Sequence, residues 1–182
     1  MDLQDRTALV TGGAAGIGAG IAERLAAEGM HVVIADRDEE AGQATAARAG
    51  GSFVSADLAT SAGVRVAVDA ACRSAPPLGV LVNNAGGVQE PCFPAAEPAA
   101  WEGTLDLNLR AVMLATQLVL RPMQGHGRGA VINIASVAGL GTTSHDAPEY
   151  AVAKGRGDAV HRLPGPAARR HAGRADHGVP GR

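Results

Sequence analysis

Short apolar runs alternate with helical periodicities along most of this 182-residue chain. Leu9 and Val10 belong to a run typical of a buried parallel strand. Ile17, Ile21 and Leu25 then recur every fourth residue, as on one face of an amphipathic helix. The further predicted strands cover residues 31–35, 52–56, 80–82 and 129–136. Strands that alternate with helices predict an α/β fold with a parallel sheet and right-handed crossovers.

Three glycines, Gly12, Gly16 and Gly18, separate the first predicted strand from the first predicted helix. Because glycine has no Cβ, the chain can turn sharply there and bring its backbone close to a pyrophosphate. A helix that begins near Gly16 would direct its free N–H groups and the positive end of its dipole at that phosphate. A plain glycine-rich turn is the alternative. The flanking strand and helix favour a dinucleotide site that contains these glycines and Ile17.

Asp36 ends the second predicted strand and follows Gly16 by about twenty residues, the usual spacing of the acidic residue that binds the adenosine ribose. Its carboxylate could accept hydrogen bonds from both ribose hydroxyls and would repel a 2′-phosphate, so we predict NAD in preference to NADP. Arg37 complicates this prediction, because its guanidinium could bind that phosphate. Alternatively, Asp36 could cap the helix that is expected from Asp38 onward.

Two more polar segments follow the third and fourth predicted strands. Asp57, with Leu58 after it, could bind an adenine amino group, but it could equally cap the next helix. The segment 83–87 offers two amides that can satisfy backbone groups at the carboxyl edge of the sheet, and small residues that let a flat ligand approach. An Asn-Gly-type turn is the alternative there. The predicted cofactor site therefore also includes Asp57, Leu58, Asn84, Ala85 and Gly86.

The fifth predicted strand ends at Ser136, and Tyr150 and Lys154 follow on one face of a predicted helix, one turn apart. A nearby ammonium group and the positive charge of a nicotinamide ring would favour the phenolate form of Tyr150. That phenol could then take or give the hydroxyl proton of an alcohol–carbonyl pair, while Ser136 would hydrogen-bond the same oxygen. The Tyr-x-x-x-Lys spacing alone is a weak signal, and the serine that ends the preceding strand strengthens it.

The chain resembles the short-chain dehydrogenase/reductase family over roughly residues 3–154. The matching elements are Thr11-Gly12-x-x-x-Gly16-x-Gly18, Asp57-Leu58, Asn83-Asn84-Ala85-Gly86, Ser136 and Tyr150-x-x-x-Lys154. The resemblance implies a three-layer Rossmann-type sheet, doubly wound and parallel, with strand order 3-2-1-4-5. It further implies NAD(P)-dependent hydride transfer to or from a small secondary alcohol or ketone.

The same resemblance assigns two further roles. Lys154 would hold the nicotinamide ribose as well as support Tyr150, so both residues also belong to the predicted cofactor site. Asn108 lies within a predicted helix, where asparagine is a poor helix former. It would correspond to the family's asparagine, whose site helps to hold a proton-relay water. A buried asparagine bonded to the backbone is the alternative.

Residues 98–121 predict one long helix with two apolar faces. The first face comprises Leu105, Leu109, Val112, Met113, Thr116 and Leu120, and the second comprises Leu107, Leu114 and Leu118. A helix that is apolar on two faces usually packs on the sheet and on a partner. Because the family pairs this helix across a dimer interface, we expect a homodimer or homotetramer formed through residues 98–121.

Composition narrows the possible partners. The net charge of −2 does not favour nucleic-acid binding, and two cysteines, Cys72 and Cys92, provide neither a disulfide framework nor a metal-ligand cluster. No apolar run approaches the length of a membrane span, and Asp2 and Asp5 lie where a secretory leader would be basic. We therefore expect a cytoplasmic protein without a metal, nucleic-acid or membrane partner.

The sequence changes character after Lys154. Glycines and Pro164 oppose a continued helix, and Val179 is the single large aliphatic residue between positions 167 and 182, a composition that does not support a packed core. We divide the chain into an NAD(P)-binding catalytic domain, residues 1–154, and an irregular basic tail, residues 155–182, in place of the family's last strands. A genuine flexible extension and a reading-frame change in a GC-rich gene both explain the tail, and we favour the second.

Two other functions remain open at this point. A truncated relative would bind nucleotide at most, because the family's substrate lid and last strands are not recognisable in the tail. Alternatively, the arginine-rich tail could bind nucleic acid, although no aromatic residue accompanies its arginines, which favours a solvated segment. The substrate cannot be predicted, since residues 139–146 offer only small and polar groups without a diagnostic feature.

Overall fold

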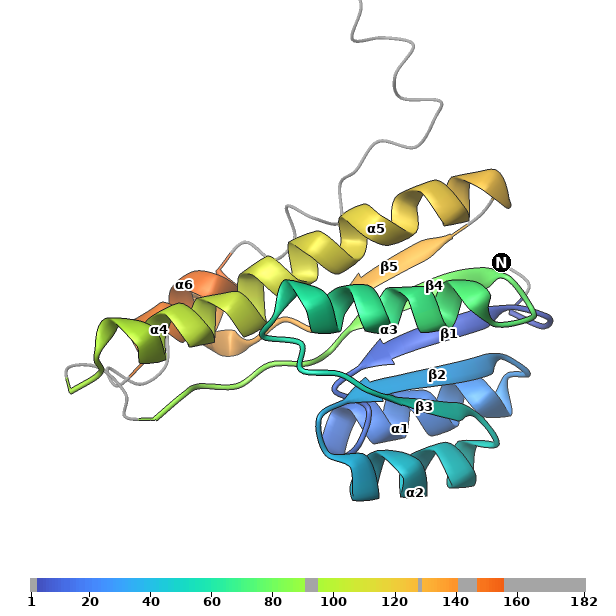
Figure 1. Cartoon of the computed structure of the whole chain (residues 1–182), viewed down its shortest axis with the longest axis horizontal. Helices are drawn as coiled ribbons and strands as arrows, with labels where there is room; N and C mark the ends of the chain where they lie inside the picture. Colours follow the sequence, from blue (N-terminus) through green and yellow to red (C-terminus); the bar gives the residue numbers. More distant parts are fainter. Residues whose placement is uncertain (1–2, 91–94, 128, 141–146, 156–182) are drawn as a thin grey trace, which may run out of the picture.

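A computed structural model of the chain describes residues 3–90, 95–127, 129–140 and 147–155. Within these ranges, one parallel sheet forms the centre of the molecule (Figure 1). Its strands are β1 (Thr7–Thr11), β2 (His31–Asp36), β3 (Ser52–Ser55), β4 (Leu78–Asn83) and β5 (Ala130–Asn133). The strand order is β3-β2-β1-β4-β5, and every neighbouring pair is parallel. The predicted fold and strand order are therefore confirmed.

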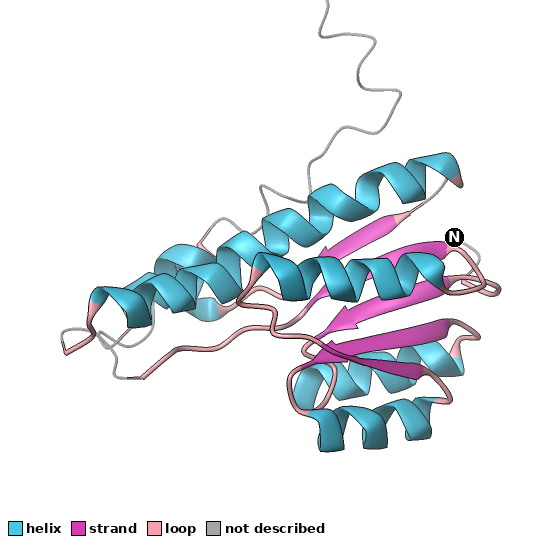
Figure 2. Ribbon diagram, in the orientation of Figure 1, coloured by secondary structure: helices cyan, strands magenta, loops and turns pink. Residues whose placement is uncertain are grey.

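Helices cover both faces of the sheet, so the molecule has three layers (Figure 2). The helical elements are α1 (Gly16–Ala27), α2 (Glu39–Ala49), α3 (Ser61–Arg73), α4 (Pro98–Leu105), the π-helix η1 (Asp106–Arg110), α5 (Ala111–Gly125), the 3₁₀-helix η2 (Val137–Leu140) and α6 (Pro148–Lys154). Helices α1 and α2 pack on one face, and α3 and α5 pack on the other. In a doubly wound sheet of this kind, a ligand can bind in the crevice at the carboxyl ends of the strands.

Strand periodicity divides the core into two clusters. Ala8 and Val10 of β1 belong to the cluster under α1 and α2, whereas Leu9, between them, belongs to the cluster under α3 and α5. All five residues of β1 are buried, because both faces and both edges of this central strand are covered. This burial on both faces explains why the chain has a continuous apolar run at β1.

The expected single helix over residues 98–121 is wrong in one respect. A π-turn, η1, separates α4 from α5 and inserts an extra residue into the helical repeat. The first expected apolar face is not uniform, since Thr116 is 2% exposed whereas Met113, on the same helix α5, is 56% exposed. The second expected face, which comprises Leu107, Leu114 and Leu118, packs against the core, as one of the two faces was expected to do. The π-turn also points Asn108 inward, where it is 3% exposed.

Some expectations fall outside the described residues. These include residues 156–182 of the predicted tail and residues 141–146 of the segment expected near the substrate, so the proposed division into domain and tail stays a prediction. None of the helices within the described ranges combines the length and the hydropathy that a membrane span requires.

Candidate active site

A cleft of about 680 Å³ opens at the carboxyl ends of the strands. The turns after all five strands contribute to it, and α6 closes one end. The predicted site residues in its lining are Gly12, Ile17, Gly18, Asp36, Arg37, Asp57, Leu58, Asn84, Ala85, Gly86, Ser136, Tyr150 and Lys154. The two predicted residues outside the lining are Gly16 and Asn108. The volume lies within the range that small-molecule and cofactor sites occupy.

The turn after β1 requires glycine because it packs against the turn after β4. Gly12 has a φ of +64°, and a Cβ there would lie 2.7 Å from Ala85 Cα. A Cβ on Gly18 would overlap the carbonyl oxygen of Gly12. Asn84 fastens the two turns together, since its Nδ2 donates to the carbonyl oxygens of Thr11 at 3.1 Å and Gly12 at 2.8 Å. Two loops that are far apart in the sequence thus form one rigid floor.

The start of α1 has the features of a phosphate site. Its N-cap, Ala15, has no side chain that could bond the first helical N–H groups, and the first turn contains no acidic residue. Gly16 has a φ of +56°, and no other part of the protein comes within 4 Å of the position that a Cβ would take. Free N–H groups, the positive helix end and open space together suit the pyrophosphate of a dinucleotide.

Asp36 lies at the end of β2 with its carboxylate oriented by the backbone. Its Oδ2 accepts from the N–H of Ala14 at 3.1 Å, and its Oδ1 accepts from the N–H groups of Arg37 at 2.7 Å and Asp38 at 3.2 Å. Asp38 caps α2 by accepting from the N–H of Ala41 at 3.0 Å, so the capping alternative for Asp36 does not hold. The carboxylate of Asp36 therefore faces the cleft with a fixed orientation, beside an exposed Arg37.

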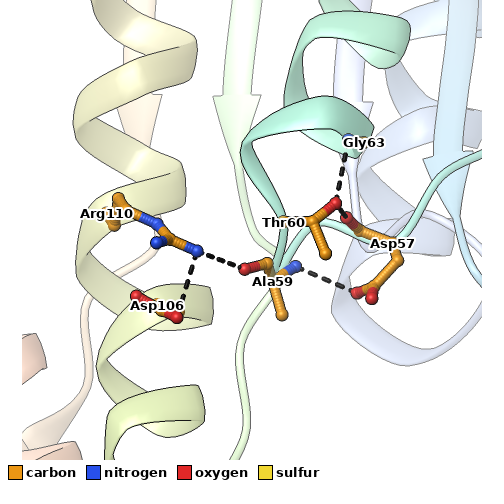
Figure 3. Close-up of polar contacts among 6 residues, drawn as sticks. All are labelled: Asp57, Ala59, Thr60, Gly63, Asp106 and Arg110. Carbon is orange, nitrogen blue, oxygen red and sulfur yellow. Dashed lines mark hydrogen bonds and ion pairs between the residues drawn. The ribbon is translucent and has the colours of Figure 1, made fainter.

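The loop after β3 holds Asp57 in a similar way (Figure 3). Its Oδ1 accepts from the N–H of Ala59 at 3.0 Å. Thr60, not Asp57, caps α3, since its Oγ1 accepts from the N–H of Gly63 at 3.0 Å. Asp57 is exposed in the cleft and is free of a capping role.

Asn108 lies outside the lining of the cleft and bonds to Gly87, which is part of that lining. Its Nδ2 donates to the carbonyl oxygens of Gly87 at 2.6 Å and Thr104 at 2.8 Å, and its Oδ1 accepts from the N–H of Gly87 at 3.1 Å. The side chain therefore matches the backbone-bonded alternative. Gly86 lies between Asn108 and Lys154, and a Cβ there would come within 2.7 Å of Asn108 Oδ1 and 3.1 Å of Lys154 Nζ. The π-turn thus fixes the loop after β4 next to the lysine.

Ser136, Tyr150 and Lys154 gather at the β5 end of the cleft. Lys154 Nζ lies over the Tyr150 ring, 5.8 Å from its centroid, and it donates to the carbonyl oxygen of Ile134 at 3.2 Å. Partial burial lowers the pKa of the Lys154 ammonium below its usual value. Ser136 Oγ accepts from the N–H of Ala138 at 3.2 Å, which leaves its O–H for another acceptor.

The family described as short chain dehydrogenase matches residues 6–166, which is most of the chain and extends beyond Lys154. The chain belongs to the short-chain dehydrogenase family. It is 40% identical over 157 residues to the short-chain reductase protein NovJ of Streptomyces niveus, and this match covers 84% of the chain and 59% of NovJ. It is also 36% identical to a probable galactose dehydrogenase, GalD, of Rhizobium meliloti, with 84% of the chain and 62% of GalD covered.

Solved structures agree with this membership. A metagenomic short-chain oxidoreductase in complex with NADP superposes with a TM-score of 0.77 and 30% identity, covering 85% of this chain and 72% of the other. A short chain dehydrogenase/reductase family protein superposes with a TM-score of 0.74 and 34% identity, covering 85% and 64%. The chain spans about three fifths of the length of the first curated relatives that it matches.

Several residues in the cleft were not predicted. They are Ala15, Ala56, Ala59, Gly87, Val88, Gln89, Leu107, Ile134 and Ala135. Most contribute backbone or small apolar side chains, which carry no chemical signature in a sequence. The sequence signal that could have found them is their position beside predicted residues. Ala59, for example, follows Leu58, and Ala135 precedes Ser136.

Proposed function

We propose that this chain binds NAD(P) in the cleft and transfers a hydride between the nicotinamide and a small secondary alcohol or ketone. One observation carries the proposal: the glycine turn at the start of α1 and the set of Ser136, Tyr150 and Lys154 line opposite parts of one cleft. The geometry of the glycine turn suits a pyrophosphate, as described above. The set of Ser136, Tyr150 and Lys154 at the other end has the residue types that bind an alcohol oxygen and move its proton.

Each residue of the set has a distinct role in this proposal. Bound NAD(P) would supply the hydride acceptor or donor. In the oxidative direction Tyr150, as phenolate, accepts the proton of the substrate hydroxyl while the hydride leaves the carbinol carbon, and in the reductive direction it returns that proton to the oxygen. Ser136 donates a hydrogen bond to the same oxygen. Lys154 stabilises the phenolate and would contact the nicotinamide ribose, and the site of Asn108 would help to hold a relay water.

We further propose that NAD is preferred to NADP. The oriented carboxylate of Asp36 supports this preference, because it would accept from ribose hydroxyls and repel a 2′-phosphate. Arg37 is the opposing feature. Replacing Asp36 by Ala should shift the ratio of NADP to NAD affinity toward NADP by about tenfold or more. An unchanged ratio, or wild-type protein that binds NADP more tightly, would reject the NAD preference.

The central experiment compares wild-type protein with Tyr150→Phe. NADH and NADPH are titrated into each, and turnover is measured on a panel of secondary alcohols and ketones. We expect Tyr150→Phe to bind nucleotide as the wild type does and to lose about 10²- to 10⁴-fold in turnover. Wild-type protein that binds nucleotide but turns over no substrate would instead support the second function, a relative that only binds nucleotide. The specific argument for that function is that the chain spans about three fifths of the length of its relatives.

We also propose that a second copy of the chain packs on the outer face of the η1–α5 segment. Leu109 and Met113 are 38% and 56% exposed there, one turn apart, which is unusual for large apolar side chains on adjacent turns. Light scattering after size exclusion tests this proposal. Met113→Asp should lower the molar mass, and a wild-type protein that is monomeric at every concentration would reject it.

A further inference from the structure

Arg110 joins two parts of the chain that the proposed reaction does not connect. It is the last residue of η1, and its Nη2 donates to the carbonyl oxygen of Ala59, in the loop after β3, at 2.6 Å (Figure 3). The same Nη2 lies 3.0 Å from Oδ2 of Asp106 at the start of η1. This one nitrogen therefore contacts an acceptor in the loop after β3 and a carboxylate on its own helical element, so the guanidinium is held from two sides.

Ala59 is the residue that orients Asp57. Its N–H donates to Asp57 Oδ1 at 3.0 Å, while its carbonyl oxygen is held by Arg110. Asp57, Leu58 and Ala59 all line the cleft, on the side of β2 and β3 where Asp36 also lies. The N–H group of Ala59 thus holds the Asp57 carboxylate, which faces the cleft, and the carbonyl group of Ala59 is bonded to Arg110 of η1.

The π-turn contacts both sides of the cleft in this way. Asn108 bonds both backbone groups of Gly87 in the loop after β4, and Arg110 bonds Ala59 in the loop after β3. The two anchors lie two residues apart on one short element. A rigid element between two loops fixes the distance between them before any ligand arrives, which reduces the ordering cost of binding.

We propose that Arg110 is a positioning residue for the adenosine half of the cofactor, acting through Ala59 on the orientation of Asp57. This inference rests on the proposed function, since it concerns the same cleft. Arg110 itself does not line the cleft, so its effect on binding is indirect.

A surface ion pair without further role is the competing explanation. The Arg110 and Asp106 side chains are 48% and 35% exposed, and exposed pairs at this spacing contribute little to stability. The chain offers a matched control in Arg24 of α1, which forms an i,i+4 pair at greater exposure with Glu28, the C-cap of that helix, and for which no contact with a loop of the cleft is found among the described residues. Substituting each arginine in turn separates the two effects, because Arg24→Ala removes only an ion pair, whereas Arg110→Ala also removes the bond to Ala59.

The test measures the affinity for ADP-ribose by calorimetry and the amide hydrogen exchange of residues 57–63, both on the full chain. Arg110→Ala should weaken ADP-ribose binding by about three- to tenfold, the usual cost of one hydrogen bond, and should raise exchange in that segment without ligand. Arg110→Lys, which keeps a charged donor, should recover most of both losses. Arg24→Ala should change neither quantity, and a thermal melt verifies that each variant is folded.

The outcomes separate the two proposals. Wild-type protein that does not bind ADP-ribose would reject the proposed function and this inference with it. Wild-type binding that Arg110→Ala leaves unchanged would overturn the inference alone, whether or not exchange rises, because the anchor would then serve the loop and not the ligand. Equal losses in Arg110→Ala and Arg24→Ala would overturn it too, since a general effect of charge would explain them.

Discussion

Strands β1 and β5 end at the same cleft, but the protein supports them differently. All five residues of β1 are buried between two neighbouring strands, whereas none of the four residues of β5 is buried and Ile132 is 43% exposed. Within the described residues, β5 pairs with β4 alone. The proposed nucleotide side of the cleft therefore lies in the interior of the sheet, and the proposed catalytic side lies at the edge of the strands that the structure describes.

The loops after these strands differ in the same sense. After β1, Gly12 and Gly18 have no side chains, so backbone atoms of neighbouring turns can approach one another and a phosphate can approach the backbone. After β5, the proposed chemistry depends on side chains that are present in the cleft, those of Ser136, Tyr150 and Lys154. Added atoms should therefore damage the first region, and removed atoms should damage the second.

Gly18→Ala tests the first half of this comparison and should have the largest effect. The added Cβ would overlap the Gly12 carbonyl and come within 2.5 Å of Asn84 Nδ2, so the two turns must separate. We expect the free energy of unfolding to fall by about 1–3 kcal/mol, as for other overpacked sites, and NAD(P) binding to be lost. Chemical denaturation and nucleotide titration measure the two effects.

Gly20→Ala is the matched control for Gly18→Ala. It lies two residues later in α1, is exposed, and has no contact within 4 Å of the added Cβ. Alanine is the better helix former, so this variant should gain about 0.5–1 kcal/mol. Equal stabilities of the two variants would show that the contact between the turns does not need glycine.

Asn108→Ala tests the link between the two regions. It would leave the N–H and carbonyl groups of Gly87 without their buried partner, at a cost of about 2 kcal/mol in unfolding free energy. The exposed Gln117, on the following helix, provides a control whose change to Ala should lie within about 0.5 kcal/mol of the wild type. A loss for Asn108→Ala that is no greater than this would mean that the loop after β4 keeps its position without the π-turn.

The strands and their alternation with helices could be predicted because they depend on runs and spacings that one sequence displays, whereas the strand order and the double winding came from the resemblance to the family. The π-turn could not be predicted. Residues 98–121 have a helical composition throughout, and the single extra residue in η1 follows from inward packing of Asn108, a tertiary contact with Gly87. The first predicted apolar face was wrong in part for a separate reason, because it combined Met113, which is exposed, with Thr116, which is buried on the same helix α5.

The candidate site divides in a similar manner. Residues with a distinctive type, such as Asp36, Ser136 and Tyr150, could be proposed from motif spacing, and the structure brings them to one cleft. Ala59 acts through its N–H and carbonyl groups, which every residue except proline possesses, so its type reveals nothing. Arg110 is an ordinary surface arginine until its contact with Ala59, 51 residues away in the sequence, is known.

Lys154 allows a smaller but direct test of the catalytic side, because the chain contains no other lysine. Reductive methylation with ¹³C-formaldehyde would label its Nζ and the chain's α-amino group, and the methyl shift would report the lysine titration. We expect a pKa below that of the same sample in denaturant, because burial disfavours the ammonium form. A pKa equal to or above the denatured value would show that Lys154 is better solvated, or more stabilised by its neighbours, than the structure indicates.

The sign of the effect on stability follows from the same shift. Below the lowered pKa, Lys154 is charged in both states and the folded state bears the full cost of burying the charge. Between that value and the ordinary lysine pKa, the unfolded chain binds more protons, so the stability of the wild type should rise with pH relative to Lys154→Met. A difference that is constant with pH would contradict the expected shift.

Ile132→Thr tests the edge position of β5 and should have the smallest effect on folding. A β-branched apolar side chain exposed on an edge strand favours pairing with another chain, so the variant should aggregate more slowly while its unfolding free energy stays within about 0.5 kcal/mol. Val66→Thr, with 46% exposure on α3, removes a similar apolar surface away from the sheet. If both variants slow aggregation equally, exposed apolar area is the cause. Slowing by Ile132→Thr alone would locate the weakness at the strand edge, on the side of the cleft that carries the proposed catalytic residues.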